Sequence, residues 1–120
     1  MRRFYWSLKH AMRGLHVAFV SGRNLRIQLS VAVLVLVLAI LFAVKPWEFI
    51  LLLLLCVAIL TLELFNSVVE RMADGLSPRL KPMVRDIKDM MAAAVLLVSG
   101  VAAIVGLVIF VPYFLRLLGA

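Results

Sequence analysis

Three long apolar segments restrict this chain to a membrane fold more strongly than any other feature of its sequence. They occupy residues 27–44, 47–65 and 90–115, and the third contains no charged residue. An α-helix needs about 20 predominantly apolar residues to cross the hydrocarbon core of a bilayer. Only 16% of the chain is charged, whereas soluble domains average about 25%. The sequence therefore predicts an all-α integral membrane protein with three transmembrane helices.

The N-terminal segment, residues 1–22, has a different pattern. Its apolar side chains recur at helical spacing, and basic side chains fill most of the remaining positions. This pattern is typical of an amphipathic helix that lies in the membrane interface. Gly14, Ser21 and Gly22 are natural places for a bend before the first span. We expect residues 1–120 to form one membrane domain, because the connections are too short to hold a soluble one.

The positive charges indicate how the spans are oriented. All Lys and Arg residues except Lys45 and Arg116 lie within residues 1–26 and 66–91. Because positive residues favour the cytoplasmic side, we expect the N-terminus and the 66–91 loop there, in a multi-pass topology. The net charge of +7 suits anionic headgroups or a polyphosphate. A chain this apolar is not expected to bind nucleic acid.

A polar stripe runs out of the second apolar segment towards the basic loop. Glu63, Asn66, Glu70 and Asp74 fall within about 80° of one another on a helix. A solvated face with polar helix–helix contacts is the simplest interpretation of such a stripe. However, Glu63 still lies inside the apolar run, and an ionisable residue at membrane depth is a functional-site hypothesis by default. We therefore interpret the stripe as a functional site.

Phosphoryl transfer to a lipid alcohol needs this combination of groups. A deep carboxylate, Glu63, would act as the base that deprotonates or orients the lipid hydroxyl. Glu70, about 10 Å nearer the water, would hold Mg²⁺ together with phosphate oxygens. Lys88 at the foot of the third span would neutralise phosphate charge. The sequence contains no glycine-rich phosphate loop and no zinc-ligand spacing, so a nucleotide would be bound without a standard motif.

These residues carry a resemblance to a known family. Residues 63–70 read ELFNSVVE, and they are followed by Asp74 and by KDMMAAAV at residues 88–95. This pattern resembles the prokaryotic diacylglycerol kinase family, which includes the undecaprenol kinases of Gram-positive bacteria. The resemblance extends to AMRGL at residues 11–15 and RNLRI at residues 23–27, so it covers nearly the whole chain.

The resemblance implies a homotrimer of three-span subunits in the bacterial inner (cytoplasmic) membrane, with each active site shared between neighbouring subunits. ATP with Mg²⁺ would enter from the cytoplasm and the lipid alcohol from the bilayer. The implied roles are catalytic base for Glu63, metal ligand for Glu70, ATP or active-site contacts for Asn66, Asp74, Lys88 and Asp89, and lipid contacts for Arg3, Asn24 and Arg26.

Three departures from the family pattern bear on the metal and the nucleotide. Gly22 stands where relatives carry a second metal-binding glutamate. The number of bound metal ions, one or two, is therefore left open. Arg79 and Lys81 replace a Glu-Tyr-His stretch, and His10 stands where some relatives have tyrosine; we assign all three to the ATP site. Fixed cations at positions 79 and 81 could replace metal charge. On that hypothesis, Arg79→Ala with Lys81→Ala raises the apparent KM for ATP.

The sequence favours a lipid kinase over two other interpretations. The acceptor is diacylglycerol or undecaprenol, and the stretch at residues 23–27 resembles the undecaprenol branch more closely. A catalytically degenerate member of the same fold, acting as a non-enzymatic membrane protein, is the alternative that Gly22 suggests. A small transporter or channel fits less well, because a path needs polar groups across the whole membrane and these carboxylates cluster at one end.

Overall fold

The computed structural model describes residues 1–75 and 81–119, which form helices joined by short connections. The elements are α1 (Arg2–Ser21), α2 (Arg23–Leu41), α3 (Pro46–Asp74) and α4 (Lys81–Leu117). The described residues contain no strand. Helices α2, α3 and α4 are each long and apolar enough to cross a membrane. The expected all-α membrane fold, with an N-terminal amphipathic helix, is thereby confirmed.

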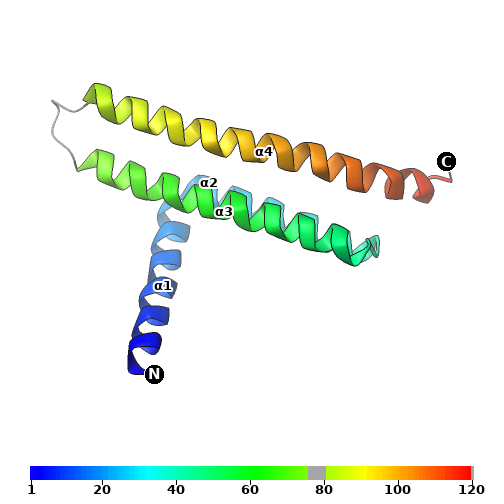
Figure 1. Ribbon diagram of the computed structural model, residues 1–120, viewed down its shortest axis with the longest axis horizontal. Helices are drawn as coiled ribbons and strands as arrows, with labels where there is room; N and C mark the ends of the chain where they lie inside the picture. The colour runs from blue at the N-terminus through cyan, green and yellow to red at the C-terminus, as the bar shows by residue number, and fades with distance from the viewer. Residues whose placement is uncertain (76–80, 120) are drawn as a thin grey trace.

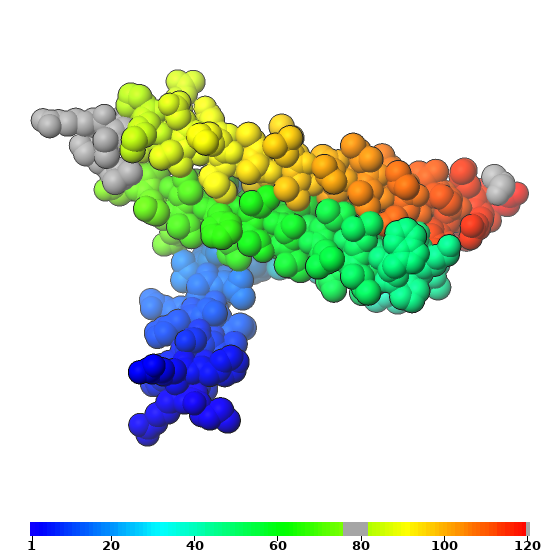
Figure 2. All heavy atoms as spheres, in the orientation of Figure 1, coloured from blue at the N-terminus to red at the C-terminus, as the bar shows by residue number. Residues whose placement is uncertain are grey.

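The three apolar helices lie side by side, and α1 projects from them. Helices α3 and α4 run antiparallel along the longest dimension of the molecule, with α2 behind α3 in this view (Figure 1). Helix α1 leaves this bundle at a steep angle, and its N-terminus is the point farthest from α4 (Figure 1). The space-filling view shows α1 as a separate protrusion (Figure 2), within overall dimensions of 60 × 42 × 21 Å.

The corner between α1 and α2 is a single residue, Gly22. Its backbone is extended (φ −100°, ψ 102°), and its N–H donates a 2.7 Å hydrogen bond to the carbonyl of Ala18. The guanidinium of Arg26 closes the corner with a 3.1 Å bond to the carbonyl of Val20. Gly14 was a second candidate for this bend, but it lies inside an unbroken α1.

The turn between α2 and α3 is tight and ends at a proline. Ala43 adopts the left-handed conformation (φ 50°), and Pro46 begins α3, where its missing N–H costs nothing. The backbone N–H of Lys45 donates a 2.9 Å bond to the carboxylate of Glu48. The Tyr113 hydroxyl of α4 donates to the same carboxylate oxygen, so this group ties α3 to α4.

The small buried core lies at this same end of the bundle. Ala39, Leu52 and Ile109 come from α2, α3 and α4 and pack together. Phe42 adds contacts between aromatic rings with Phe110, as well as with two further rings of α4. Most other large apolar side chains are exposed. Exposure has little cost in a bilayer, because lipid chains are as apolar as the side chains that face them.

Both helices that flank the 76–80 segment extend well past their apolar parts. Helix α3 continues to Asp74, so the whole polar stripe is helical. Helix α4 begins at Lys81, well before the expected third span at residues 90–115. Pro82 does not prevent this, because it lies in the first turn, where a backbone N–H has no helical partner. The polar residues that flank the spans are therefore positioned by rigid helices.

Candidate active site

The polar stripe of α3 runs from a buried carboxylate to exposed ones. Because α3 is helical from Pro46 to Asp74, Glu63, Asn66, Glu70 and Asp74 stay on one face. Glu63 is only 5% exposed, Asn66 is half-buried, and both Glu70 and Asp74 are exposed. The stripe thus joins a group shielded from water to groups that a water-borne ligand can reach.

The foot of α4 contributes a cation to this stripe. The Nζ of Lys88 lies 3.9 Å from Oδ1 of Asp74, with the side chains 42% and 80% exposed. An ion pair this exposed adds little stability. Its consequence is positional, because it holds an ammonium beside the open end of the carboxylate stripe. The neighbouring Asp89 is exposed on the same helix.

An apolar cavity of about 470 Å³ lies at membrane depth between α2, α3 and α4. On α3 it is lined by Leu52, Cys56 and Ile59, and the next residue on that face is Glu63. The remaining lining is apolar except for Gln28 of α2 and Ser99 of α4. The lining therefore suits an apolar chain.

Four other predicted site residues belong to α1 and α2 and not to α3. Arg3 is exposed in the first turn of α1, at the end of that helix remote from α3 (Figure 1). His10 lines a second cavity, between α1 and α3. Asn24 and Arg26 are exposed at the start of α2, and the Arg26 guanidinium donates a hydrogen bond to the Val20 carbonyl within the α1–α2 corner. Within the described residues, no hydrogen bond or ion pair joins these side chains to Glu63.

The structure does not test the assignment of Arg79 and Lys81 to the ATP site. Arg79 lies outside the described residues. Lys81 is placed only as the first residue of α4, and its side chain lies outside the description as well. Their assignment to the ATP site stays a prediction.

Gly22 lies beside the stripe even though it carries no side chain. A Cβ at this position would be 3.6 Å from the hydroxyl of Ser67, which lies between Glu63 and Glu70 on α3. The same Cβ would come within 2.6 Å of the Ala18 carbonyl, so the backbone would have to move. A carboxylate at position 22 would thus be well placed to join the stripe, but the corner as built accommodates glycine alone.

The donor set suits a magnesium ion that is shared with a nucleotide. No group of three or more His, Cys, Asp or Glu side chains in residues 1–75 and 81–119 is arranged to hold a metal ion. Glu70 and Asn66 nevertheless offer oxygen ligands about one helical turn apart. Mg²⁺ usually binds through one or two carboxylates and completes its shell with water and substrate phosphates. The residues present fit that mode and not an all-protein cage.

Sequence reasoning missed two polar features that depend on contacts between helices. One is the carboxylate of Glu48, whose partner Tyr113 lies 65 residues away in the chain. The other is the cavity between α1 and α3, to which Arg13 and Arg71 contribute. Arg71 directly follows the Glu70 of the stripe, so its helical position could be predicted, but the crossing of α1 that makes a cavity there could not.

Comparison with known proteins identifies the family of this chain. Residues 9–110 match the family described as prokaryotic diacylglycerol kinase. Among curated proteins, the chain is similar to an undecaprenol kinase of Bacillus subtilis (strain 168). The two are 30% identical over 112 residues, which cover 93% of this chain and 91% of that protein. No solved structure gives a significant match. The family match spans most of the chain and includes the stripe, so this protein belongs to the prokaryotic diacylglycerol kinase family of membrane lipid kinases.

Proposed function

We propose that this protein transfers the γ-phosphate of ATP to the hydroxyl of a membrane lipid alcohol, with Mg²⁺ as cofactor. One observation supports this proposal most directly. The carboxylate of Glu63 is buried one helical turn beyond Ile59 of the apolar cavity, and the exposed Glu70 and Asp74 follow it on the same face of α3. A membrane-dissolved acceptor and a water-soluble donor can meet only at such a boundary.

In the proposed step, Glu63 accepts the proton of the lipid hydroxyl while the hydroxyl oxygen attacks the γ-phosphorus. The bond from that phosphorus to the oxygen of the β-phosphate breaks, and ADP leaves with the bonding electron pair. The products are ADP, a lipid phosphate monoester and a proton on Glu63. Because Glu63 is shielded from water, hydrolysis of ATP does not compete with transfer to lipid.

The exposed residues would position the nucleotide. Lys88 contacts phosphate oxygens, and Asp74 keeps its ammonium beside the stripe. Glu70, with the Asn66 amide oxygen, holds Mg²⁺, which when bound neutralises charge on the phosphates. Asp89 and His10 are proposed as further contacts to ATP. Arg3, Asn24 and Arg26 are proposed to contact the lipid.

Two lipids qualify as acceptor, diacylglycerol and undecaprenol, and we propose undecaprenol. The similar Bacillus subtilis protein is named an undecaprenol kinase, and the match with it covers 93% of this chain. The RNLRI stretch at residues 23–27 also resembles that branch. The cavity does not discriminate between the two, because its apolar lining suits an isoprenoid and an acyl chain equally.

We further propose a homotrimer in the bacterial inner membrane, with the N-terminus and the active site on the cytoplasmic side. The distribution of Lys and Arg supports this orientation. Arg3 lies near the N-terminal end of α1, which projects away from α3 (Figure 1), and this position supports a site that a neighbouring subunit completes. Mixing inactive Glu63→Gln subunits with subunits altered at Arg3 would restore turnover in such a shared site.

The test of the acceptor is a transfer assay with radiolabelled ATP and purified protein in mixed micelles. Undecaprenol and diacylglycerol are supplied separately, and the labelled products are extracted and identified. We expect label in undecaprenyl phosphate and a much lower rate with diacylglycerol. The reverse preference would transfer the assignment to diacylglycerol. Absence of label from both lipids would favour the alternative function, a catalytically degenerate member of the family. Gly22, at the position of a metal-binding glutamate in relatives, suggests that alternative.

A further inference from the structure

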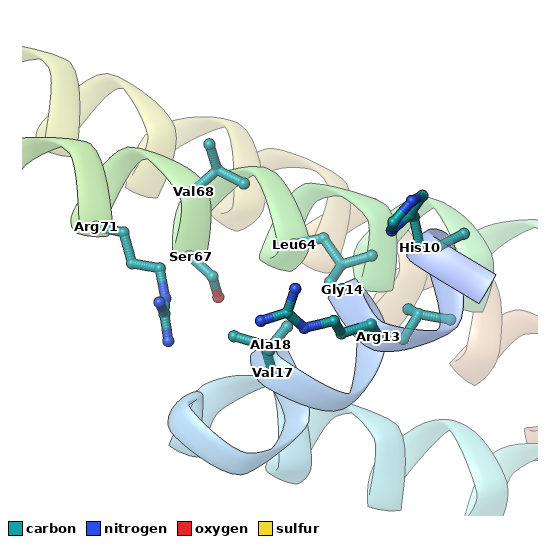
Figure 3. A pocket seen from close by; sticks show the side chains of 11 residues that line it. His10, Arg13, Gly14, Val17, Ala18, Leu64, Ser67, Val68 and Arg71 are labelled. Atoms are coloured by element: carbon teal, nitrogen blue, oxygen red, sulfur yellow. The ribbon is translucent and has the colours of Figure 1, made fainter. Parts of the chain in front are cut away.

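A cavity of about 700 Å³ separates the surface helix α1 from the polar end of α3. It is distinct from the carboxylate stripe, since neither Glu63 nor Glu70 lines it. Ser67 and Arg71 point from α3 towards α1, and Arg13 extends from α1 along the recess towards Ser67 (Figure 3). The lining residues are His10, Ala11, Arg13, Gly14, Leu15, Val17, Ala18, Leu64, Ser67, Val68 and Arg71.

The charge in this cavity is of one sign. Arg13 and Arg71 each present a guanidinium, and no acidic side chain of the described residues lines the cavity. Neither guanidinium forms an ion pair with a described residue. The hydroxyl of Ser67 is engaged, because it donates a 3.0 Å bond to the Glu63 carbonyl. The donors that line the cavity are therefore the two guanidiniums and the imidazole of His10, and the planar guanidiniums match the geometry of a phosphate group.

The rest of the cavity is apolar. Leu15 and Val17 of α1 face it from one side, and Leu64 and Val68 of α3 from the other. These residues lie on an amphipathic helix and at the polar end of a spanning helix, which is the level where headgroups meet hydrocarbon. A ligand that satisfies both parts of the lining carries an anion on an apolar body.

We propose that this cavity binds an anionic phospholipid of the membrane. Arg13 and Arg71 bind its headgroup phosphate, and an acyl chain lies against Leu64 and Val68. The bound phosphate links α1 to α3, and α1 otherwise buries only Ala18. An anionic lipid thus holds the surface helix against the bundle. The inference does not depend on the proposed kinase activity, because binding requires no turnover.

The test measures lipid binding by the full-length protein in phosphatidylcholine bilayers that contain a trace of spin-labelled lipid. The fraction of motionally restricted phosphatidylglycerol is compared with that of phosphatidylcholine. We expect wild type to prefer phosphatidylglycerol by at least about fivefold, and Arg13→Gln with Arg71→Gln to remove most of that preference. The matched control is Arg2→Gln with Arg85→Gln, which removes the same charge from exposed positions outside the cavity and should retain the preference.

A second variant removes the space while it retains both arginines. Val68→Trp should fill the recess and lower the phosphatidylglycerol preference as the double variant does, with helical content by circular dichroism unchanged. Equal loss in the Arg2/Arg85 control would mean that general surface charge attracts the lipid, which overturns the proposal. Wild-type preference in the Arg13/Arg71 variant would overturn it too. Displacement of the labelled lipid by millimolar ATP or inorganic phosphate would assign the cavity to a soluble phosphate compound.

Discussion

The ammonium of Lys88 lies 3.9 Å from the carboxylate of Asp74 and so joins the foot of α4 to the end of the polar stripe on α3. Both side chains are substantially exposed, so this pair contributes little to folding. Its position matters more. Because the ammonium is exposed, it stays charged and accessible, so it can bind the phosphates of a nucleotide beside the row of carboxylates.

We predict that Lys88→Met raises the KM for ATP by about tenfold or more, because a charge-assisted contact to phosphate is lost. The KM for the lipid should change little. The measurement is steady-state kinetics with each substrate varied in turn. Arg85→Gln is the control, since it removes an exposed cation from the same helix without touching the stripe. An equal rise in that variant would show that net charge, and not the position of Lys88, governs ATP binding.

The proposed metal ligand can be tested separately from the base. Glu70→Gln retains the shape of the side chain but removes the charge that Mg²⁺ prefers. We expect about a tenfold higher Mg²⁺ concentration for half-maximal turnover, with partial recovery in Glu70→Asp. The readout is a Mg²⁺ titration at saturating ATP. An unchanged titration curve would remove Glu70 from the metal site.

The corner at Gly22 makes a prediction about stability. Gly22→Ala should destabilise the protein by about 1–3 kcal/mol, because its Cβ would lie 2.6 Å from the Ala18 carbonyl. Gly14→Ala is the matched control. Its Cβ meets nothing within 4 Å, and alanine inside a helix should stabilise by about 0.5–1 kcal/mol.

Unfolding of both variants in detergent micelles, followed by circular dichroism, gives the comparison. If Gly22→Ala is as stable as wild type, the corner has room for a side chain. Position 22 could then accept the glutamate that relatives carry, and Gly22→Glu would become a direct probe of the second metal ion.

The features that could be predicted from the sequence are those set by local pattern. The uncharged run at residues 90–115 predicts a spanning helix by its length, and the spacing of Glu63 and Glu70 predicts a shared helix face. The break at Gly22 was one of several candidate bends, because local sequence did not distinguish it from Gly14. The structure places the bend at Gly22, whose extended backbone separates α1 from α2.

Features that depend on how helices pack were not predictable in this way. In the sequence, Glu48 simply follows the turn before the second span. Its hydrogen bond with Tyr113 depends on how α4 is aligned along α3, which local sequence does not specify. Arg13 and Arg71 become neighbours of one cavity only because α1 crosses α3. In the proposed homotrimer, the placement of Arg3 relative to Glu63 of a neighbouring subunit would also depend on subunit packing, which local periodicity does not encode.

Glu63 is proposed as the base of a lipid kinase, and two carboxylate variants on the same helix test this role. Glu63 and Glu48 are both buried glutamates of α3, 5% and 8% exposed, at opposite ends of the bundle. Label transfer from ATP to undecaprenol is measured for wild type, Glu63→Gln and Glu48→Gln in parallel. We predict that Glu63→Gln lowers turnover by about 100-fold or more, whereas Glu48→Gln retains most of it. Near-wild-type turnover in a folded Glu63→Gln protein would contradict the account.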